Sequence, residues 1–218
     1  MNLIEQSVGR TALTLPGATR IFHDHNIDFC CGGRISLREA AERAGLAPEA
    51  LVAELETLAK GESDERDWQS ASNDELIDHI LSRYHDVHRQ QLPELIRMAR
   101  RVEHVHGSRD TCPDGLADLL TELHQEMESH MQKEEQILFP MLRQGMGAQA
   151  RGPIAVMRQE HGDHGEHLER LMALTDDITV PKGACTTWRA LYAGLREFRD
   201  DLMQHIHLEN NLLFERAG

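Results

Sequence analysis

The stretches HMQKEEQILFP (residues 130–140) and HIHLENNLLFE (residues 205–215) each place a histidine and a glutamate four residues apart. The pairs His130/Glu134 and His205/Glu209 interrupt apolar stripes whose alternating three- and four-residue spacing is typical of a helix face packed inside a bundle. A carboxylate buried on such a face costs on the order of several kcal/mol unless a partner compensates its lost hydration. The pattern therefore predicts a metal ion inside a helical bundle.

Both stripes continue along most of each expected helix, so we expect their side chains to face the interior. They comprise Leu116, Leu120, Leu123, Met127, His130, Glu134, Ile137 and Met141 in the first helix, and Trp188, Leu191, Leu195, Phe198, Leu202, His205, Glu209 and Leu212 in the second.

Length and charge exclude several classes of protein. The 218 residues are enough for one large domain, or for a medium domain with a small one. No apolar run approaches the roughly 18 residues of a membrane span, and MNLIEQSVGR is unlike a secretory signal. We therefore expect a cytoplasmic protein with reduced thiols. The formal net charge of −14 argues against binding to nucleic acid or to an anionic membrane.

The first part of the chain predicts a small helical N-terminal domain, residues 1–66. Short helices are expected over residues 16–25, 37–44 and 48–60, the second capped by Ser36 and Glu39. The polar stretch GESDERDWQSAS, residues 61–72, is typical of a linker, which places the boundary near Asp67.

Residues 67–218 predict an all-α fold, an up-down-up-down four-helix bundle. The four long helices are expected over residues 72–105, 114–145, 154–178 and 187–216, joined by short loops. A capping box of Ser72 and Glu75 opens the first helix, and Pro93 should bend it.

An internal repeat relates the two halves of this bundle. The segment ILSRYHDVHRQQLPEL, residues 80–95, aligns with VMRQEHGDHGEHLERL, residues 156–171, so that His85 matches His161 and His88 matches His164. Two similar helical hairpins would place one ligand set from each half around a shared centre.

The candidate ligands thus combine imidazoles and carboxylates without a thiolate, which suits iron or manganese and can also hold zinc. Spacing alone does not decide whether His85 or His88 is the ligand. A histidine that is not itself a ligand could orient the side chain of one that is. The alternative is a helical scaffold without metal.

Glu126 and Glu160 are expected as hydrogen-bond acceptors for the ligands. Five further histidines are expected to be solvated: His104, His106, His124, His167 and His207. The candidate set is His85, His130, Glu134, His161, His205 and Glu209.

Adjacent Cys30 and Cys31, followed by Gly32 and Gly33, are the other chemically suggestive feature. Adjacent cysteines can form a strained disulfide, hold a soft metal, or react with nitric oxide or persulfide. Equally, they can be two small residues in a tight turn, where the glycines permit backbone angles that other residues avoid.

These motifs resemble the iron–sulfur cluster repair proteins, the di-iron "repair of iron centres" family of the YtfE/ScdA type. The likeness covers nearly the full length and is most specific at DFCCGG (28–33), RYHDVHRQQLPELI (83–96), SHMQKEEQILFPM (129–141), QEHGDHGE (159–166) and HIHLENN (205–211). The resemblance implies a small N-terminal domain carrying the double cysteine, joined to a hemerythrin-like bundle. It also implies the six ligands named above, and thereby selects His85 over His88.

The resemblance further implies two non-haem iron ions per chain, bridged by oxide and carboxylate, in a cytoplasmic homodimer. Its partners would be iron–sulfur proteins damaged by nitrosative or oxidative stress. We expect an iron donor more than a classical enzyme, with Cys30 and Cys31 assisting transfer or docking. The alternatives are an enzyme that reduces nitric oxide, and a module that only binds nitric oxide or oxygen.

Overall fold

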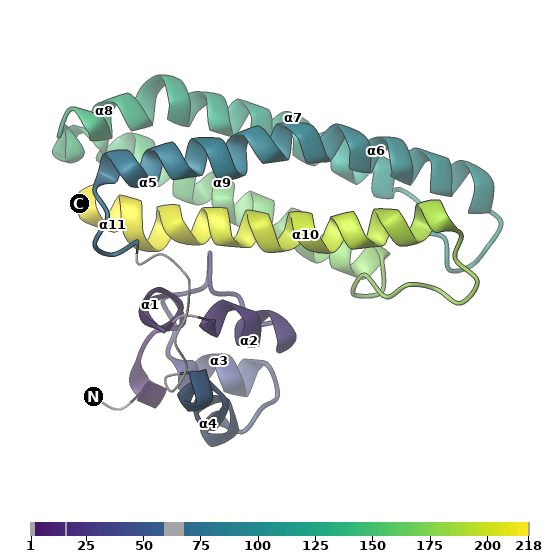
Figure 1. Ribbon diagram of the computed structural model, residues 1–218, viewed down its shortest axis with the longest axis horizontal. Coiled ribbons are helices and arrows are strands. Elements are labelled where there is room, and N and C mark those ends of the chain that lie inside the picture. The colour runs from purple at the N-terminus through teal and green to yellow at the C-terminus, as the bar shows by residue number, and fades with distance from the viewer. Residues whose placement is uncertain (1–2, 16, 59–67, 218) are drawn as a thin grey trace. The chain divides into compact units, whose positions relative to one another are not determined.

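The computed structural model describes residues 3–15, 17–58 and 68–217. In this part of the chain the structure is helical, apart from turns and one isolated bridge between Ser7 and Ser36. Two compact units are present, one formed by Met1–Leu76 with Met203–Gly218 and the other by Ile77–Leu202. Helix α10 (Thr186–Leu208) is continuous through the second boundary between them (Figure 1). The domain boundary predicted near Asp67 lies outside the described residues.

The N-terminal segment of the first unit contains short helices. They are η1 (Leu3–Glu5), α1 (Val8–Thr14), α2 (Ala18–Asp24), α3 (Leu37–Arg43) and α4 (Pro48–Leu58). Ser36 caps α3 by accepting a hydrogen bond from the Glu39 backbone N–H, as predicted. The expected end of the third helix, residues 59 and 60, lies outside the described residues. Helix α1 was not predicted, although Ser7 caps it in the same way.

Long helices dominate the second unit and lie side by side (Figure 1). Helix α5 (Asn73–Ile80) continues through η2 (Leu81–His85) into α6 (Asp86–His106). Helix α7 (Leu116–Lys133) continues through η3 (Glu134–Leu138) into α8 (Phe139–Arg143). Helix α9 (Gly147–Leu174) and helix α10 follow. Helix α6 packs against α7, and α7 packs against α9. The all-α helical bundle is therefore confirmed.

The end of the third long helix differs from its prediction. The helix stops at Leu174 rather than Ile178, because Asp176, Asp177 and Ile178 have φ angles of 50°, 53° and 53°. These left-handed angles are incompatible with a right-handed helix. The Thr175 hydroxyl accepts a hydrogen bond from the Ile178 backbone N–H and stabilises this turn.

The start of the same helix differs as well. It begins at Gly147, so Pro153 lies inside it rather than before it. Proline within a helix removes one backbone hydrogen bond but does not prevent the earlier turns from forming. The amides of Gln149 and Ala150 both donate to the Met146 carbonyl, which stabilises that first turn.

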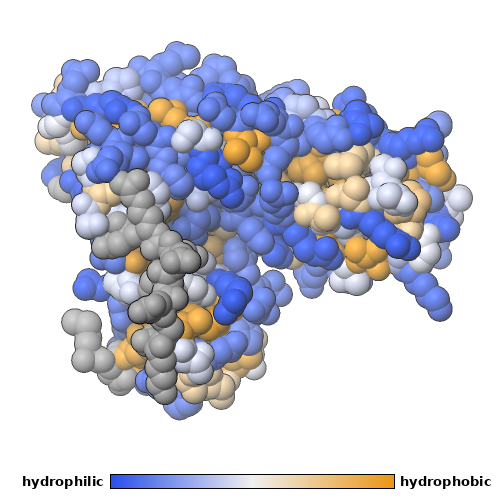
Figure 2. Space-filling view, viewed as in Figure 1, coloured by the Kyte–Doolittle hydropathy of each residue, from blue (hydrophilic) through white to orange (hydrophobic). Residues whose placement is uncertain are grey.

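The surface seen in Figure 2 is mostly hydrophilic, with apolar side chains scattered over it. This agrees with the 28% of charged residues in the sequence. None of the described helices is long and apolar enough to span a membrane.

Candidate metal centre

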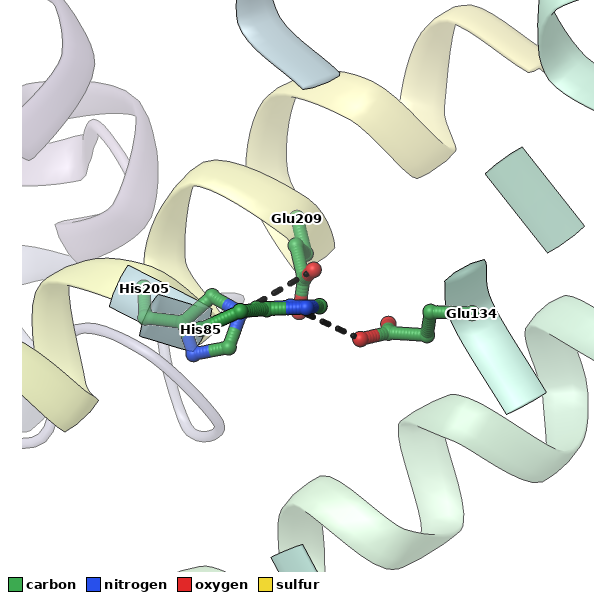
Figure 3. Close-up of side chains that lie close together, drawn as sticks. All are labelled: His85, Glu134, His205 and Glu209. Carbon is green, nitrogen blue, oxygen red and sulfur yellow. Dashed lines mark ion pairs between the residues drawn. The ribbon is translucent and has the colours of Figure 1, made fainter. Parts of the chain in front are cut away.

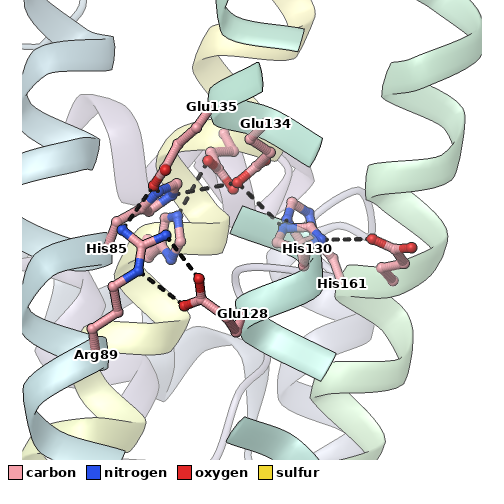
Figure 4. A network of polar contacts seen from close by, with 10 residues as sticks. His85, Arg89, Glu128, His130, Glu134, Glu135 and His161 are labelled. Atoms are coloured by element: carbon pink, nitrogen blue, oxygen red, sulfur yellow. Dashed lines mark hydrogen bonds and ion pairs between the residues drawn. The ribbon is translucent and has the colours of Figure 1, made fainter. Parts of the chain in front are cut away.

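The His85 ring lies between the carboxylates of Glu134 and Glu135, both in η3, which continues α7. The ring is fully buried, with Nδ1 2.8 Å from Oε1 of Glu135 and Nε2 3.4 Å from Oε2 of Glu134. Arg89 in turn lies 2.9 Å from the same Glu135 oxygen (Figure 4). A histidine ligand is typically oriented in this way, with one ring nitrogen bonded to a carboxylate and the other directed at the metal.

His130 on α7 is held in the same way, with Glu160 on α9 as its carboxylate partner. Its Nδ1 lies 2.9 Å from Oε2 of Glu160, while its Nε2 lies 3.5 Å from Glu134 and 3.1 Å from Nε2 of His161. The hydrogen bond with His130, aided by an ion pair with Lys133, lowers the pKa of Glu160 from 4.5 to about 2. Glu160 is thus ionised at neutral pH and accepts the His130 N–H. This contact agrees with the expectation that Glu160 accepts a hydrogen bond from a candidate ligand.

His205 and Glu209 lie one turn apart where α10 passes into η4 (Glu209–Leu213). Nε2 of His205 is 3.2 Å from Oε1 of Glu209, and the two residues are 1% and 0% exposed. Figure 3 shows this pair and the pair formed by His85 and Glu134. His130 and Glu134 are likewise 2% and 0% exposed, so both predicted H-x-x-x-E pairs are buried rather than lying on the surface.

The six predicted residues fall into two groups whose ligand atoms lie within 4.8 Å of one another. One group is His85, Glu134, His205 and Glu209, and the other is His130, Glu134, His161 and Glu209. Glu134 and Glu209 belong to both groups. Since one carboxylate can place an oxygen on each of two cations, this sharing fits a pair of metal ions better than a single ion.

Three of the candidate ligands lie in π-helical turns. His85 ends η2, Glu134 begins η3 and Glu209 begins η4. A π turn adds one residue to the helical turn, and such turns are frequent at functional sites. These segments were not predicted from the sequence, because a regular α-helical period was expected throughout.

The π turn after Glu134 also corrects part of the predicted stripe. Ile137 was expected in the interior but is 52% exposed, while Leu138 and Leu142 are 1% and 5% exposed. The extra residue shifts the interior face by one position, so Leu138 and Leu142 replace Ile137 and Met141 on it.

His88 and His164 are buried but belong to neither group of candidate ligands. The His88 ring lies edge-on to Phe198, with centroids 5.5 Å apart, and the His164 ring lies edge-on to His130 at 5.0 Å. A cavity of about 360 Å³ between α7 and α9 places polar side chains beside His164. It is lined by Gln125, Glu126, Ser129, Lys133, Glu160, Asp163 and His164.

Two of the histidines expected to be solvated are buried instead. His167 is 7% exposed and His207 is 1% exposed. His207 Nδ1 lies 3.2 Å from the Phe29 carbonyl oxygen, and desolvation lowers the pKa of the His207 ring from 6.5 to about 4. These positions could not be identified from the apolar period, because each histidine lies beside the stripe rather than on it. Oε2 of Glu126 lies 3.6 Å from Nδ1 of His167, which is not among the six candidate ligands, so the expectation for Glu126 stays a prediction.

The double cysteine lies within a turn organised by Asp28. One Asp28 carboxylate oxygen accepts the backbone N–H groups of Cys30 and Cys31, at 2.9 and 3.0 Å, and the other accepts that of Gly32 at 2.7 Å. The Cys30 and Cys31 sulfurs are 3.5 Å apart, so no disulfide joins them. Hydrogen bonding to Cys31, together with burial, raises the pKa of the Cys30 thiol well above 9.0. Asp28, Cys30 and Cys31 also form a third group of metal-binding residue types.

This turn packs against η4 within the first unit. The Asn210 side-chain amide donates to the Cys30 carbonyl at 3.1 Å, and the Asn211 amide donates to the Phe29 carbonyl at 3.3 Å. A side chain on Gly33 would come within 2.6 Å of the Phe29 carbonyl and 3.1 Å of Gly9. Close packing, rather than the unusual backbone angle that was expected, therefore requires glycine at Gly33.

Comparison with known proteins gives full-length similarity. The model of the Hemerythrin HHE cation binding domain matches residues 76–217, and the model of ScdA_N, a domain of unknown function, matches residues 4–59. The chain is 55% identical over 217 residues to an "Iron-sulfur cluster repair protein YtfE" of Dickeya chrysanthemi, with 100% of this chain and 98% of that protein covered. Proteins of the same name from Citrobacter koseri and Yersinia pseudotuberculosis are 54% and 53% identical over the same shares of both chains. The chain belongs to the YtfE-type family of iron–sulfur cluster repair proteins and carries that family's hemerythrin-like cation-binding domain.

Proposed function

We propose that this protein holds a pair of iron ions with the six buried His and Glu residues, and donates iron to iron–sulfur clusters damaged by nitrosative or oxidative stress. The observation that carries the proposal is the pair of ligand groups that share Glu134 and Glu209. The name printed for the relatives, iron–sulfur cluster repair protein, supplies the substrate class.

The donor set fits iron that must be released. It contains imidazole and carboxylate but no thiolate, and ferrous iron stands low in the affinity order of divalent metals. Two ferrous ions carry four positive charges, and the two glutamates neutralise two of them. The remaining charge leaves room for an oxide, hydroxide, oxygen or nitric oxide ligand. When bound, the metal pair supplies Lewis acidity and one-electron chemistry. Glu135 and Glu160 keep Nε2 of His85 and of His130 directed at Glu134.

The finer expectations belong to the same proposal. The N-terminal domain would comprise residues 1–66 and the bundle residues 67–218, in a cytoplasmic homodimer. Cys30 and Cys31 would assist iron transfer or docking of the damaged protein. Their support is the Asp28 turn, which places two sulfurs and a carboxylate close together in the same unit as Glu209.

Reconstitution of a cluster enzyme tests the proposal. An enzyme whose cluster has been destroyed by nitric oxide is mixed with the iron-loaded protein, with an equal amount of free ferrous iron, or with the Glu209→Ala variant. We expect faster recovery with the iron-loaded protein, and iron content well below two per chain in the variant. Recovery no faster than with free iron would exclude donation. Multiple turnovers of nitric oxide with an electron donor would instead favour the oxidoreductase alternative.

A further inference from the structure

A fourth group of metal-binding residue types, which shares no residue with the candidate centre, lies between α7 and α9. It consists of Glu122 and Glu126, one turn apart on α7, and His167 on α9, with ligand atoms within 4.8 Å of one another. All three residues belong to the unit Ile77–Leu202. The two glutamates are exposed, whereas the His167 side chain is only 9% exposed.

The orientation of His167 determines which ring nitrogen can bind a ligand. Its Nδ1 lies 2.9 Å from the Asp163 backbone carbonyl oxygen, which can only accept, so Nδ1 carries the hydrogen. The neutral ring therefore has its lone pair on Nε2. That atom is buried and has no hydrogen-bond partner. Oε2 of Glu122 lies 3.6 Å from Nε2, which is too far for a hydrogen bond, and Oε2 of Glu126 lies 3.6 Å from Nδ1.

A lone pair facing a carboxylate is unfavourable unless something positive lies between them. A second proton on the ring is one solution, but an imidazolium hydrogen bond should close to about 2.7–2.9 Å. A bound cation is the other. Metal–nitrogen and metal–oxygen bonds of about 2.0–2.2 Å place two neighbouring ligand atoms about 3–3.5 Å apart. The observed 3.6 Å is close to that separation.

We propose that Glu122, Glu126 and His167 form an additional site for one divalent first-row transition cation. Two carboxylates neutralise the charge of the ion, and a neutral imidazole held by a backbone carbonyl is the usual form of a histidine ligand. One nitrogen and two oxygens suit Mn²⁺, Fe²⁺ or Zn²⁺, with water at the remaining positions because both glutamates are exposed. Arg170 Nη1 lies 3.4 Å from Oε2 of Glu122 and would compete with the cation, so binding should be moderate.

Titration with Mn²⁺ tests this site without depending on the proposed function. Free aqueous Mn²⁺ is counted by electron paramagnetic resonance as it is added to the purified full-length protein. Mn²⁺ lies below Fe²⁺ in the affinity order, so iron held elsewhere stays in place. We expect the wild-type chain to bind one more Mn²⁺ than Glu122→Gln and His167→Ala, in which the affinity of this site falls at least about tenfold.

Glu169→Gln is the matched control, because Glu169 is an exposed carboxylate on the same helix, two positions from His167 and directed away from it. Its Mn²⁺ binding should equal that of the wild type. Glu122 is exposed, so its variant should fold normally even if His167→Ala does not. Equal Mn²⁺ binding by the wild-type and Glu122→Gln chains would overturn the proposal, as would the absence of Mn²⁺ binding by the wild-type chain.

Discussion

His85 and His130 are positioned by the same device, a carboxylate bonded to Nδ1 that leaves Nε2 directed at Glu134. The sequence showed both His85 and His88 as candidates, but not that His85 has such an acceptor. His88 lies beside two aromatic rings, the Phe198 ring at 5.5 Å and the Tyr84 ring at 6.3 Å, and belongs to neither group of candidate ligands. The selection of His85 came from family resemblance, and the structure supplies a physical reason for it.

Glu135→Gln should weaken metal binding by about 10- to 100-fold, because the neutral amide holds the His85 ring less firmly and lowers its basicity. Glu128→Gln is the control, since Glu128 also bonds to Arg89, at 2.9 Å, and its side chain is similarly exposed, at 35% against 29% for Glu135. Competition with a coloured chelator gives the affinities. Equal losses in the two variants would show that Arg89, rather than the orientation of His85, is responsible.

Cys31 should react with iodoacetamide at least about ten times faster than Cys30 at pH 7.5. The thiolate is the nucleophile, and the pKa of the buried Cys30 thiol is raised by its hydrogen bond to Cys31 and by burial, so Cys30 remains protonated there. Peptide mass spectrometry of briefly labelled protein measures both rates. Equal labelling rates of the two thiols in the wild-type protein would contradict the raised pKa of Cys30.

The π turns are the elements that regular periodicity could not predict. Period counting located the four long helices, and capping chemistry correctly placed the start of the first one, where the Ser72 hydroxyl accepts the Glu75 backbone N–H at 3.2 Å. The seven residues of α1 are too few for a periodic signal, so only its Ser7 cap could have identified it, as the Ser36 cap identified α3. Burial of Leu138 in place of Ile137 was missed because one inserted residue changes every later position on the face.

Deleting Gln136, an exposed residue of η3, should convert that segment to a regular α-helix. Leu138 and Leu142 would then take the places of Ile137 and Met141 on the regular stripe, so packing after the deletion should be retained. The backbone around Glu134 would tighten, and we expect metal affinity to fall by about 10- to 100-fold. Far-UV circular dichroism and chelator competition check the two parts. Deleting Ser108, which lies in the loop after α6, is the control and should change neither.

At the scale of the whole molecule, the acidic composition and the candidate metal centre are connected through two buried glutamates. The surface carries most of the acidic excess, yet Glu134 and Glu209 are fully buried. A fold that keeps ionised carboxylates in its interior must compensate their lost hydration. Histidines face both glutamates, at 3.2–3.5 Å, but a neutral imidazole gives no net charge. Metal occupancy should therefore contribute directly to the stability of the folded state.

Removing the metal with a chelator should lower the melting temperature, because a ligand that binds only the folded state stabilises it by mass action. At a free metal concentration one hundred times the Kd the stabilisation is about 2.7 kcal/mol, which corresponds to about 5–10 °C for a chain of this length. In Glu134→Gln the difference between metal-loaded and stripped protein should shrink, since the neutral amide no longer requires a cation. The stripped variant should also melt at or above the stripped wild type, because it buries one charge fewer. Scanning calorimetry of the four samples measures both effects. If the wild type melted at the same temperature with and without metal, the buried carboxylates would have to be compensated by protons instead.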